Sequence, residues 1–416
     1  MKQNAKLREY AKLLINQGVH MLEGQTLSLV SPIICADFAR LCAECAYDAG
    51  AREVIMDWRD DGMTRLKYLR ADEPVFDEVA PWVKPMYDNF LEKKVAKLVL
   101  LADDPEALLG VDSRRINRAQ QARYPSIEAY SKAQTANDFQ WCVAAVSVPV
   151  WAEKVFPSLD SEDAVAALWD KIFASVRVTG DGTAPDKWRT HIATQKVLIK
   201  KLNDYNFETL RYKNSLGTNL TVGLPEGHYW SGGAEMAKLG VEFIANLPTE
   251  EIFTLPHREK VNGRVYASMP LVLSGNIVDE FWMELKNGKI VDCHAQTGEG
   301  YLRDAISVDS GASYLGEVAL VPYDSPIRNT GILFYETLFD ENAACHLAFG
   351  EAYPCISGSE KMSPEELAAA GVNDSLTHVD FMVGTSDLSI TGITHDGEEI
   401  PVFVEGNFAP NLMGKA

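Results

Sequence analysis

The sequence of 416 residues lacks any apolar run of the roughly 18–20 residues that a membrane-spanning helix needs. It also lacks an excess of positive charge, because 39 Lys and Arg residues face 59 Asp and Glu residues, for a formal net charge of −20. Nucleic acids and anionic membrane surfaces attract basic proteins, so we expect neither as a partner. The acidity favours cations and substrates with a free amine, although solubility alone also explains it.

A disulfide framework is not expected either, because the seven cysteines are an odd number, scattered along the chain and mostly in apolar settings. Cys42 and Cys45 form a CxxC pair, but no second pair follows, so a zinc ribbon is not expected. The N-terminal segment is charged and amphipathic, without the apolar core of a signal peptide. Together these features predict a protein of the reducing cytoplasm.

Several catalytic motifs are missing as well. No GxGxxG or GxxxxGKS/T motif follows a predicted strand, which disfavours a nucleotide site. The chain has neither HExxH, the zinc motif of the zincins, nor GxSxG, the nucleophile elbow of serine hydrolases. Any hydrolytic chemistry must therefore come from another arrangement of residues.

The composition, 46% hydrophobic and 24% charged, is that of a globular chain long enough for two or three domains. In the N-terminal half, strand-like runs at 26–32, 52–58, 95–105 and 139–149 alternate with helical segments such as 4–22 and 35–50. This alternation predicts a mainly parallel sheet covered by helices. A helix of about twenty residues begins at Pro185, and we place the end of an α/β scaffold domain, residues 1–205, at its end.

Beyond residue 206 the pattern changes to short alternating runs, which predict a mainly antiparallel α+β domain over 206–416. Asn287–Gly288 and Asp396–Gly397 each separate two such runs and predict β-hairpins. Ser363 and Glu366 form a capping box that predicts a short helix ending at Gly371. We expect this second domain to carry the functional site.

One stretch of the second domain concentrates side chains that bind divalent metals through nitrogen and oxygen, namely Glu317, His346, Tyr353, His378 and Asp380. His378 and Asp380 are two residues apart in a β-branched run, so they share a face of a predicted strand. His346 and Tyr353 are seven residues apart in a segment that looks helical, so they would share a helix face if the helix continues through Gly350. Each residue has an ordinary structural explanation when taken alone, and the prediction of a metal site rests on the set.

Upstream, the run TEEIFTLPH adds Glu250 and Glu251. This run, followed by Glu317, His346, Tyr353 and an HxD pair, resembles the M29 family of metallo-aminopeptidases over essentially the whole chain. The resemblance implies metal ligands at Glu251, Glu317, His346, His378 and Asp380, with Tyr353 beside the metals or as a further weak ligand. The resemblance favours Glu251 over Glu250 as the ligand, because the separation of Glu251 from Glu317 looks like the family's. The resemblance also implies peptide substrates with a free N-terminus and a homodimer.

Three carboxylates and two imidazoles exceed the three protein ligands that a mononuclear catalytic zinc usually takes. They suit two divalent ions (Zn, Co, Mg or Mn) that share a carboxylate and a bridging water. With the peptide substrate that the resemblance implies, we expect hydrolysis of the N-terminal peptide bond. In this hypothesis Glu317 bridges the metals, Glu250 shuttles a proton, and Tyr353 donates to the oxyanion or ligates weakly.

The residues alone leave two other classes of function open. Another two-metal hydrolase, a phosphoesterase or an amidase, would use the same ligand types. A phosphate site normally adds Arg or Lys, and Arg258 and Arg328 are the basic residues that lie close in sequence. A non-catalytic metal-binding protein would need only the ligands.

Overall fold

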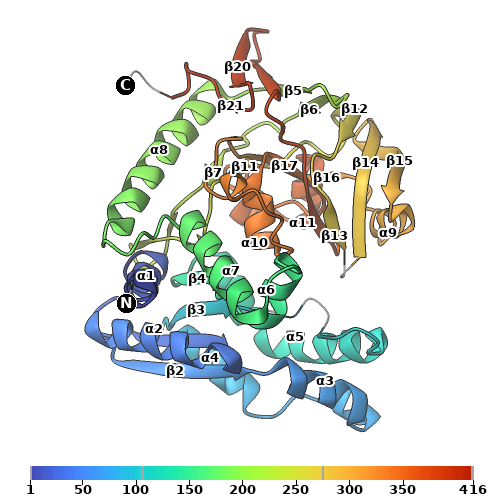
Figure 1. The fold of residues 1–416 in the computed structure, drawn as a ribbon. Coiled ribbons are helices and arrows are strands. Elements are labelled where there is room, and N and C mark those ends of the chain that lie inside the picture. Colours follow the sequence, from blue (N-terminus) through green and yellow to red (C-terminus); the bar gives the residue numbers. More distant parts are fainter. Residues whose placement is uncertain (1, 103, 105–106, 274–275, 414–416) are drawn as a thin grey trace. The chain divides into compact units, whose positions relative to one another are not determined.

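The computed structural model describes residues 2–102, 104, 107–273 and 276–413 (Figure 1). The chain divides into two compact units, Met1–Trp188 with Ala234–Pro248, and Arg189–Gly233 with Thr249–Ala416. Helix α8 (Ala184–Tyr205) runs across this division, and the assignment of a scaffold domain to 1–205 and a catalytic domain to 206–416 stays a prediction. Among the described residues, no helix combines the length and the apolar character needed to cross a membrane.

A parallel sheet forms the centre of the first unit, with the strand order β10–β4–β3–β1–β2. The strands are β1 (Thr26–Pro32), β2 (Glu53–Arg59), β3 (Ala96–Leu101), β4 (Trp141–Ala145) and β10 (Asn246–Leu247). Each neighbouring pair is parallel, which confirms the predicted sheet type. Residues 103 and 105, at the end of the predicted strand 95–105, lie outside the described residues.

Helices precede the first of these parallel strands and supply the connections between them (Figure 1). They are α1 (Lys2–Leu13), the π-helical η1 (Leu14–Gly18), η2 (Ile33–Cys35), α2 (Ala36–Asp48), α3 (Asp61–Arg70), η3 (Glu73–Phe76), α4 (Val83–Glu92), α5 (Ser113–Thr135), α6 (Pro149–Val155) and α7 (Ser161–Ser175). The segment that returns to this unit adds the short strands β8 (Glu235–Met236) and β9 (Glu242–Phe243), which pair with each other. The predicted helices 4–22 and 35–50 correspond to α1 with η1 and to α2.

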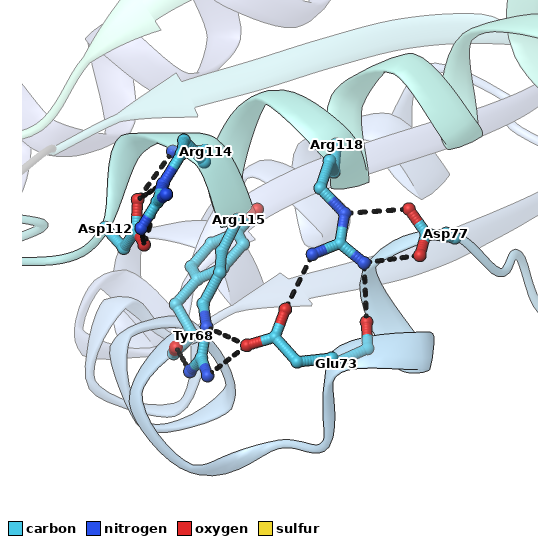
Figure 2. Close-up of polar contacts among 7 residues, drawn as sticks. All are labelled: Tyr68, Glu73, Asp77, Asp112, Arg114, Arg115 and Arg118. Atoms are coloured by element: carbon cyan, nitrogen blue, oxygen red, sulfur yellow. Dashed lines mark hydrogen bonds and ion pairs between the residues drawn. The ribbon is translucent and has the colours of Figure 1, made fainter.

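The surface of the first unit carries an ion-pair network between α5 and η3 (Figure 2). Arg118 forms ion pairs with Glu73, at 2.6 Å, and with Asp77. Arg115 also pairs with Glu73, and it donates a further hydrogen bond to the carbonyl of Tyr68 at 2.7 Å. Hydrogen bonds from Arg118 lower the pKa of both carboxyl groups. The network thus fastens η3 to α5 with nearly matched charge.

Antiparallel sheets build the second unit. One sheet has the order β18–β17–β16–β11–β7, with β7 (Ser231–Gly232), β11 (Ile252–Thr254), β16 (Leu315–Leu320), β17 (His346–Gly350) and β18 (His378–Met382). The other has the order β13–β14–β12–β6–β5–β19–β20–β21, with β15 on β14. Its strands are β5 (Thr209–Lys213), β6 (Asn219–Gly223), β12 (Val261–Tyr266), β13 (Leu271–Leu273), β14 (Asn276–Lys286), β15 (Lys289–Thr297), β19 (Ser389–Ile393), β20 (Glu399–Val404) and β21 (Asn407–Phe408).

The local predictions for this unit are confirmed. The Asn287–Gly288 turn joins β14 to β15, and the Asp396–Gly397 turn joins β19 to β20. Ser363 and Glu366 form the capping box of α11 (Pro364–Ala369). The remaining helical turns are α9 (Glu299–Ala305), η4 (Arg328–Thr330), α10 (Thr337–Asp340), η5 (Glu341–Ala343) and η6 (Ser359–Lys361).

The prediction that His346 and Tyr353 share a helix face is wrong. His346–Gly350 forms β17, and every residue of this strand is buried between β16 and β18. A central strand covered on both faces gives a continuous apolar run, which hydrophobic periodicity cannot distinguish from a buried helix. Gly350 takes a φ of 107°, and Tyr353 lies beyond the end of the strand.

Candidate metal centre

Three neighbouring strands, β16, β17 and β18, place side chains of the predicted set on one face of their sheet. Ala348 of β17 pairs with Glu317 of β16 on one side and with Asp380 of β18 on the other. Directly opposite residues of antiparallel strands point to the same face, and so do residues two apart. His346 and His378 therefore join Glu317 and Asp380 on this face. The small side chain of Ala348 leaves space between them.

Two triads of ligand-type side chains gather in the described part of the chain. Glu251, Glu317 and His346 form one, and Glu317, His378 and Asp380 form the other, each with its ligand atoms within 4.8 Å of one another. His346 Nε2 lies 3.3 Å from Glu251 Oε2. His378 Nε2 lies 3.2 Å from Glu317 Oε2 and 3.2 Å from Asp380 Oδ1. Glu317 belongs to both triads, so the two groups form one continuous cluster.

Main-chain carbonyls orient the two imidazoles. His346 Nδ1 lies 3.2 Å from the carbonyl oxygen of Ala344, and His378 Nδ1 lies 2.7 Å from that of Glu351. A carbonyl oxygen can only accept a hydrogen bond, so Nδ1 carries a proton and Nε2 points at the carboxylates. Metal-binding histidines are usually held in this way.

The cluster carries surplus negative charge. Burial raises the pKa of Glu317, and the charges of Glu251 and Asp380 raise it further. Burial alone would lower the pKa of the histidines. The hydrogen bond to Glu251 and the nearby carboxylates outweigh that effect and raise the pKa of His346 to about 10. Burial would also lower the pKa of His378, but the hydrogen bonds to Asp380 and Glu317 outweigh it and raise this pKa to about 12. The carboxylates thus attract positive charge into a largely buried site.

Glu341, in the turn η5, is a member of this cluster that the sequence analysis missed. Burial raises the pKa of its carboxyl well above the usual value, and the charges of Glu251 and Asp380 raise it further. Its neighbour Asn342 accepts the N–H of Glu250 at 2.7 Å and donates to the carbonyl of Leu338 at 3.1 Å, which holds the turn against the Glu250–Glu251 segment. In the sequence, Glu341 is one acid in a short polar turn, a pattern that solvated surface turns share.

Neither Glu250 nor Tyr353 belongs to the two triads. Glu250 is buried, and its Oε2 is 3.7 Å from Nε2 of His191, an α8 residue that also lies 2.9 Å from the carbonyl oxygen of Thr249. Glu251, the next residue, contacts His346 instead, because consecutive residues of extended chain point in opposite directions. Tyr353 is 55% exposed, with its ring centroid 5.7 Å from that of His378. The proton-shuttle role of Glu250 and the role of Tyr353 stay predictions.

The chemistry of the donor set fits divalent cations. Imidazole nitrogen and carboxylate oxygen suit zinc, cobalt, manganese and, with more oxygen ligands, magnesium. A carboxylate common to two ligand groups, as Glu317 is here, is what a pair of neighbouring ions requires. The residues present therefore fit divalent metal ions.

The chain matches known proteins over nearly its full length. It is 40% identical over 405 residues to aminopeptidase AmpS of Bacillus subtilis (strain 168), covering 97% of this chain and 98% of that protein. It is 40% identical over 408 residues to aminopeptidase 2 of Geobacillus stearothermophilus, covering 98% of both chains. The solved structure of wild-type AmpT from Thermus thermophilus superposes with a TM-score of 0.89 at 37% identity, over 98% of this chain and 99% of that one.

A more distant structure shares the fold alone. The 2,5-dihydroxypyridine dioxygenase from Pseudomonas putida KT2440 has a TM-score of 0.53 and 10% identity. The family model described as thermophilic metalloprotease (M29) matches residues 3–408, which includes all the residues of both triads. The chain therefore belongs to the M29 family of metalloproteases.

Proposed function

We propose that this protein is a metal-dependent aminopeptidase that holds two divalent cations with Glu251, Glu317, His346, His378 and Asp380. The observation that carries the proposal is the pair of triads joined by Glu317. The relatives that span nearly the whole chain are named aminopeptidases, which supports a peptide with a free N-terminus as the substrate. The metal is zinc, cobalt, magnesium or manganese, since the donor set accepts each of them.

The residues of the cluster have different roles in hydrolysis. When bound, the divalent cations supply Lewis acidity and lower the pKa of a coordinated water. Glu317 belongs to both triads and fixes their separation. The carbonyls of Ala344 and Glu351 hold the two imidazoles in their orientation. Tyr353, exposed beside His378, is placed to donate a hydrogen bond to the oxygen that becomes negative in the tetrahedral transition state.

Proton transfer requires a carboxylate near the triads that is not itself needed as a ligand. We retain Glu250 for this role and add Glu341 as a second candidate. Glu341 lies within the electrostatic field of the triads, whereas the carboxylate of Glu250 lies beside His191. Replacing each with glutamine, which removes the basic oxygen and keeps the shape, distinguishes them by the larger loss of kcat.

The charge of the site favours a substrate with an amino group. Within the described residues, no Lys or Arg forms an ion pair with Glu251, Glu317 or Asp380, whose charged partners are the two histidines. A free α-amine binds such a site either as a metal ligand or as an ammonium group paired with carboxylate. The geometry thus supports recognition of the chain end of a peptide rather than its interior.

A matched pair of substrates tests the proposal. An aminoacyl-nitroanilide should be hydrolysed, and its N-acetyl counterpart should lose at least about 10³-fold in kcat/KM, because acetylation removes the basic amine and adds bulk. Comparable rates on both would identify an endopeptidase or a general amidase. Preferential hydrolysis of a phosphate monoester would identify a phosphoesterase instead, and binding of metal without turnover of any of these would identify a non-catalytic protein.

The remaining parts of the proposal concern the cellular compartment, the partners and the oligomeric state of the enzyme. The seven cysteines, all in the described part of the chain, are buried and none is in a disulfide bond, which suits a reducing cytoplasm. The net charge of −20 disfavours nucleic acid and anionic lipid as partners. We also propose a homodimer, which light scattering on purified protein at several concentrations tests directly.

A further inference from the structure

A cavity of the second unit lies outside the triads. Its volume is about 420 Å³, and no residue of the triads lines it. Its walls come from the loop before β12, from the start of β15 and from the segment between α9 and β16. This volume lies within the range of about 300–1,000 Å³ that is usual for small-molecule sites.

Two cations face this cavity. Arg258 packs over the ring of Tyr314, with its guanidinium carbon 4.3 Å from the ring centroid. Stacking of this kind fixes the plane of the guanidinium and leaves its N–H edge available. Lys289 lies opposite Tyr314 in a β-bridge. Next to this bridge, the N–H of Ile290 donates to the carbonyl of Ser313 at 2.8 Å. Within the described residues neither Arg258 nor Lys289 forms an ion pair, in a chain whose net charge is −20.

The one acidic group among the lining residues, Asp309, is occupied by donors of its own protein. Its carboxylate accepts the N–H groups of Gly311 and Ala312 at 2.8 Å each, the N–H of Leu376 at 2.6 Å and the hydroxyl of Ser375 at 2.9 Å. These hydrogen bonds, that from Leu376 foremost, lower the pKa of Asp309. A carboxylate with four donors offers little to a ligand, so the two cations set the charge that an occupant meets.

We propose that this cavity is a binding site for a small molecule that carries an oxyanion, a carboxylate or a phosphate, held by Arg258 and Lys289. Guanidinium and ammonium groups are the usual partners of such anions, and the planar fork of arginine matches their oxygen atoms. The hydroxyls of Ser310 and Ser313 supply further donors on the same wall. Ile290 and Ile306 line the rest of the cavity and favour an apolar body next to the anionic group.

Local isotope labels allow binding to be observed at the cavity itself. Isoleucine methyl groups are labelled in the metal-loaded protein, and their NMR signals are followed during titration with inorganic phosphate and, separately, with acetate at constant ionic strength. The signals of Ile290 and Ile306 should shift and saturate with at least one probe. The signal of Ile252, the residue after Glu251, reports any binding of the same probe at the triads.

Variants of the two cations test whether Arg258 and Lys289 hold the bound anion. Lys289→Glu, an exposed residue whose replacement leaves the core intact, should weaken the affinity at Ile290 and Ile306 by about tenfold or more. Arg258→Gln should do the same, and the matched control Lys213→Glu, exposed on β5, should leave the affinity unchanged. Saturation with phosphate alone or with acetate alone supports the proposal and names the anion. Absence of saturable shifts at both isoleucines, or equal affinity in Lys289→Glu and the parent, would overturn it, whatever the peptidase assays show.

Discussion

The ion-pair network of the first unit and the triads of the second both join carboxylates to cationic nitrogen atoms, but their charge balance differs. Around η3, two arginines face Glu73 and Asp77 at the surface, and hydrogen bonds from Arg118 lower the pKa of both acids (Figure 2). In the triads, the carboxylates outnumber the imidazoles, and burial raises the pKa of Glu317. The first cluster satisfies its own charge, whereas the second does not.

This difference separates a structural cluster from a functional one. Exposed ion pairs with matched charges contribute little to stability and perform no chemistry, and they mainly hold one surface segment to another. A buried group of acids without enough cations is unstable on its own, so its presence indicates a ligand that supplies the missing charge. We therefore expect the triads to depend on an external cation and the network to be independent of it.

Removal of metal should give the largest effect. After dialysis against a chelator, hydrolysis of an aminoacyl-nitroanilide should fall by at least about 10³-fold, because the cations provide the activation of water. Adding back Zn, Co, Mn or Mg should restore it, and elemental analysis should find up to about two ions per chain. The surface network should be unaffected by the same treatment. Full activity in protein shown to be free of metal would contradict the proposed mechanism.

Loss of one ligand should come next. His378→Ala and Asp380→Ala should each lower turnover by about 10²-fold or more with the fold retained, since loss of even an outer partner of a metal ligand commonly costs about 10–100-fold. The control is His395→Ala, an exposed histidine in the turn between β19 and β20. An essential His395 together with a dispensable His378 would show that the site has been misassigned.

A change in a supporting residue should have an intermediate effect. Asn342 is fully buried and links Glu250 to the turn that carries Glu341, so Asn342→Ala should lower the free energy of unfolding by about 1–3 kcal/mol. It should also weaken metal binding, measured by competition with a chelator of known affinity. Asn219→Ala, on the exposed side of β6, is the matched control. A lower stability with unchanged metal affinity would show that Asn342 supports the fold and not the metal site.

The smallest effect concerns the surface network. The folded-state pKa of Glu73 and Asp77 lies below the ordinary values of 4.5 and 3.8, so the stabilisation is present above those values and disappears as the pH falls through the lowered folded values. Arg118→Ala should therefore lower the melting temperature slightly at neutral pH, and progressively less as the pH falls through the lowered folded values. Lys132→Ala, which breaks the single ion pair with Glu128 on the same helix, should lower it less. A difference that persists unchanged in acid would mean that Arg118 acts through packing instead.

Part of this structure could be predicted because the relevant geometry is local. Alternating strands and helices imply a parallel sheet, Asn-Gly and Asp-Gly turns imply hairpins, and a two-residue spacing in a strand places His378 beside Asp380. Each of these inferences needs only a few adjacent residues. The ligand set followed from chemistry and the family resemblance, and the structure brings its members together from four separate segments.

Other features depend on contacts between distant parts of the chain. The strand β10 joins the N-terminal sheet only because the chain returns to it at residues 246–247, about a hundred residues after β4 in sequence. The strand β17 has the same apolar pattern as a buried helix, and its neighbours β16 and β18 decide the outcome. Glu341 becomes part of the cluster only once Asn342 fixes its turn against residue 250.

The orientation of both imidazoles by main-chain carbonyls has a consequence for how this site can vary. A carbonyl is present whichever residue occupies position 344 or 351, so side-chain replacement there does not remove the hydrogen bond to His346 or His378. Gly316 is different, because a Cβ atom at that position would lie 2.1 Å from the carbonyl oxygen of Glu351. Any larger residue at 316 would displace the very atom that aims His378. The orientation of the two imidazoles therefore tolerates side-chain replacement at 344 and 351 better than replacement of Gly316.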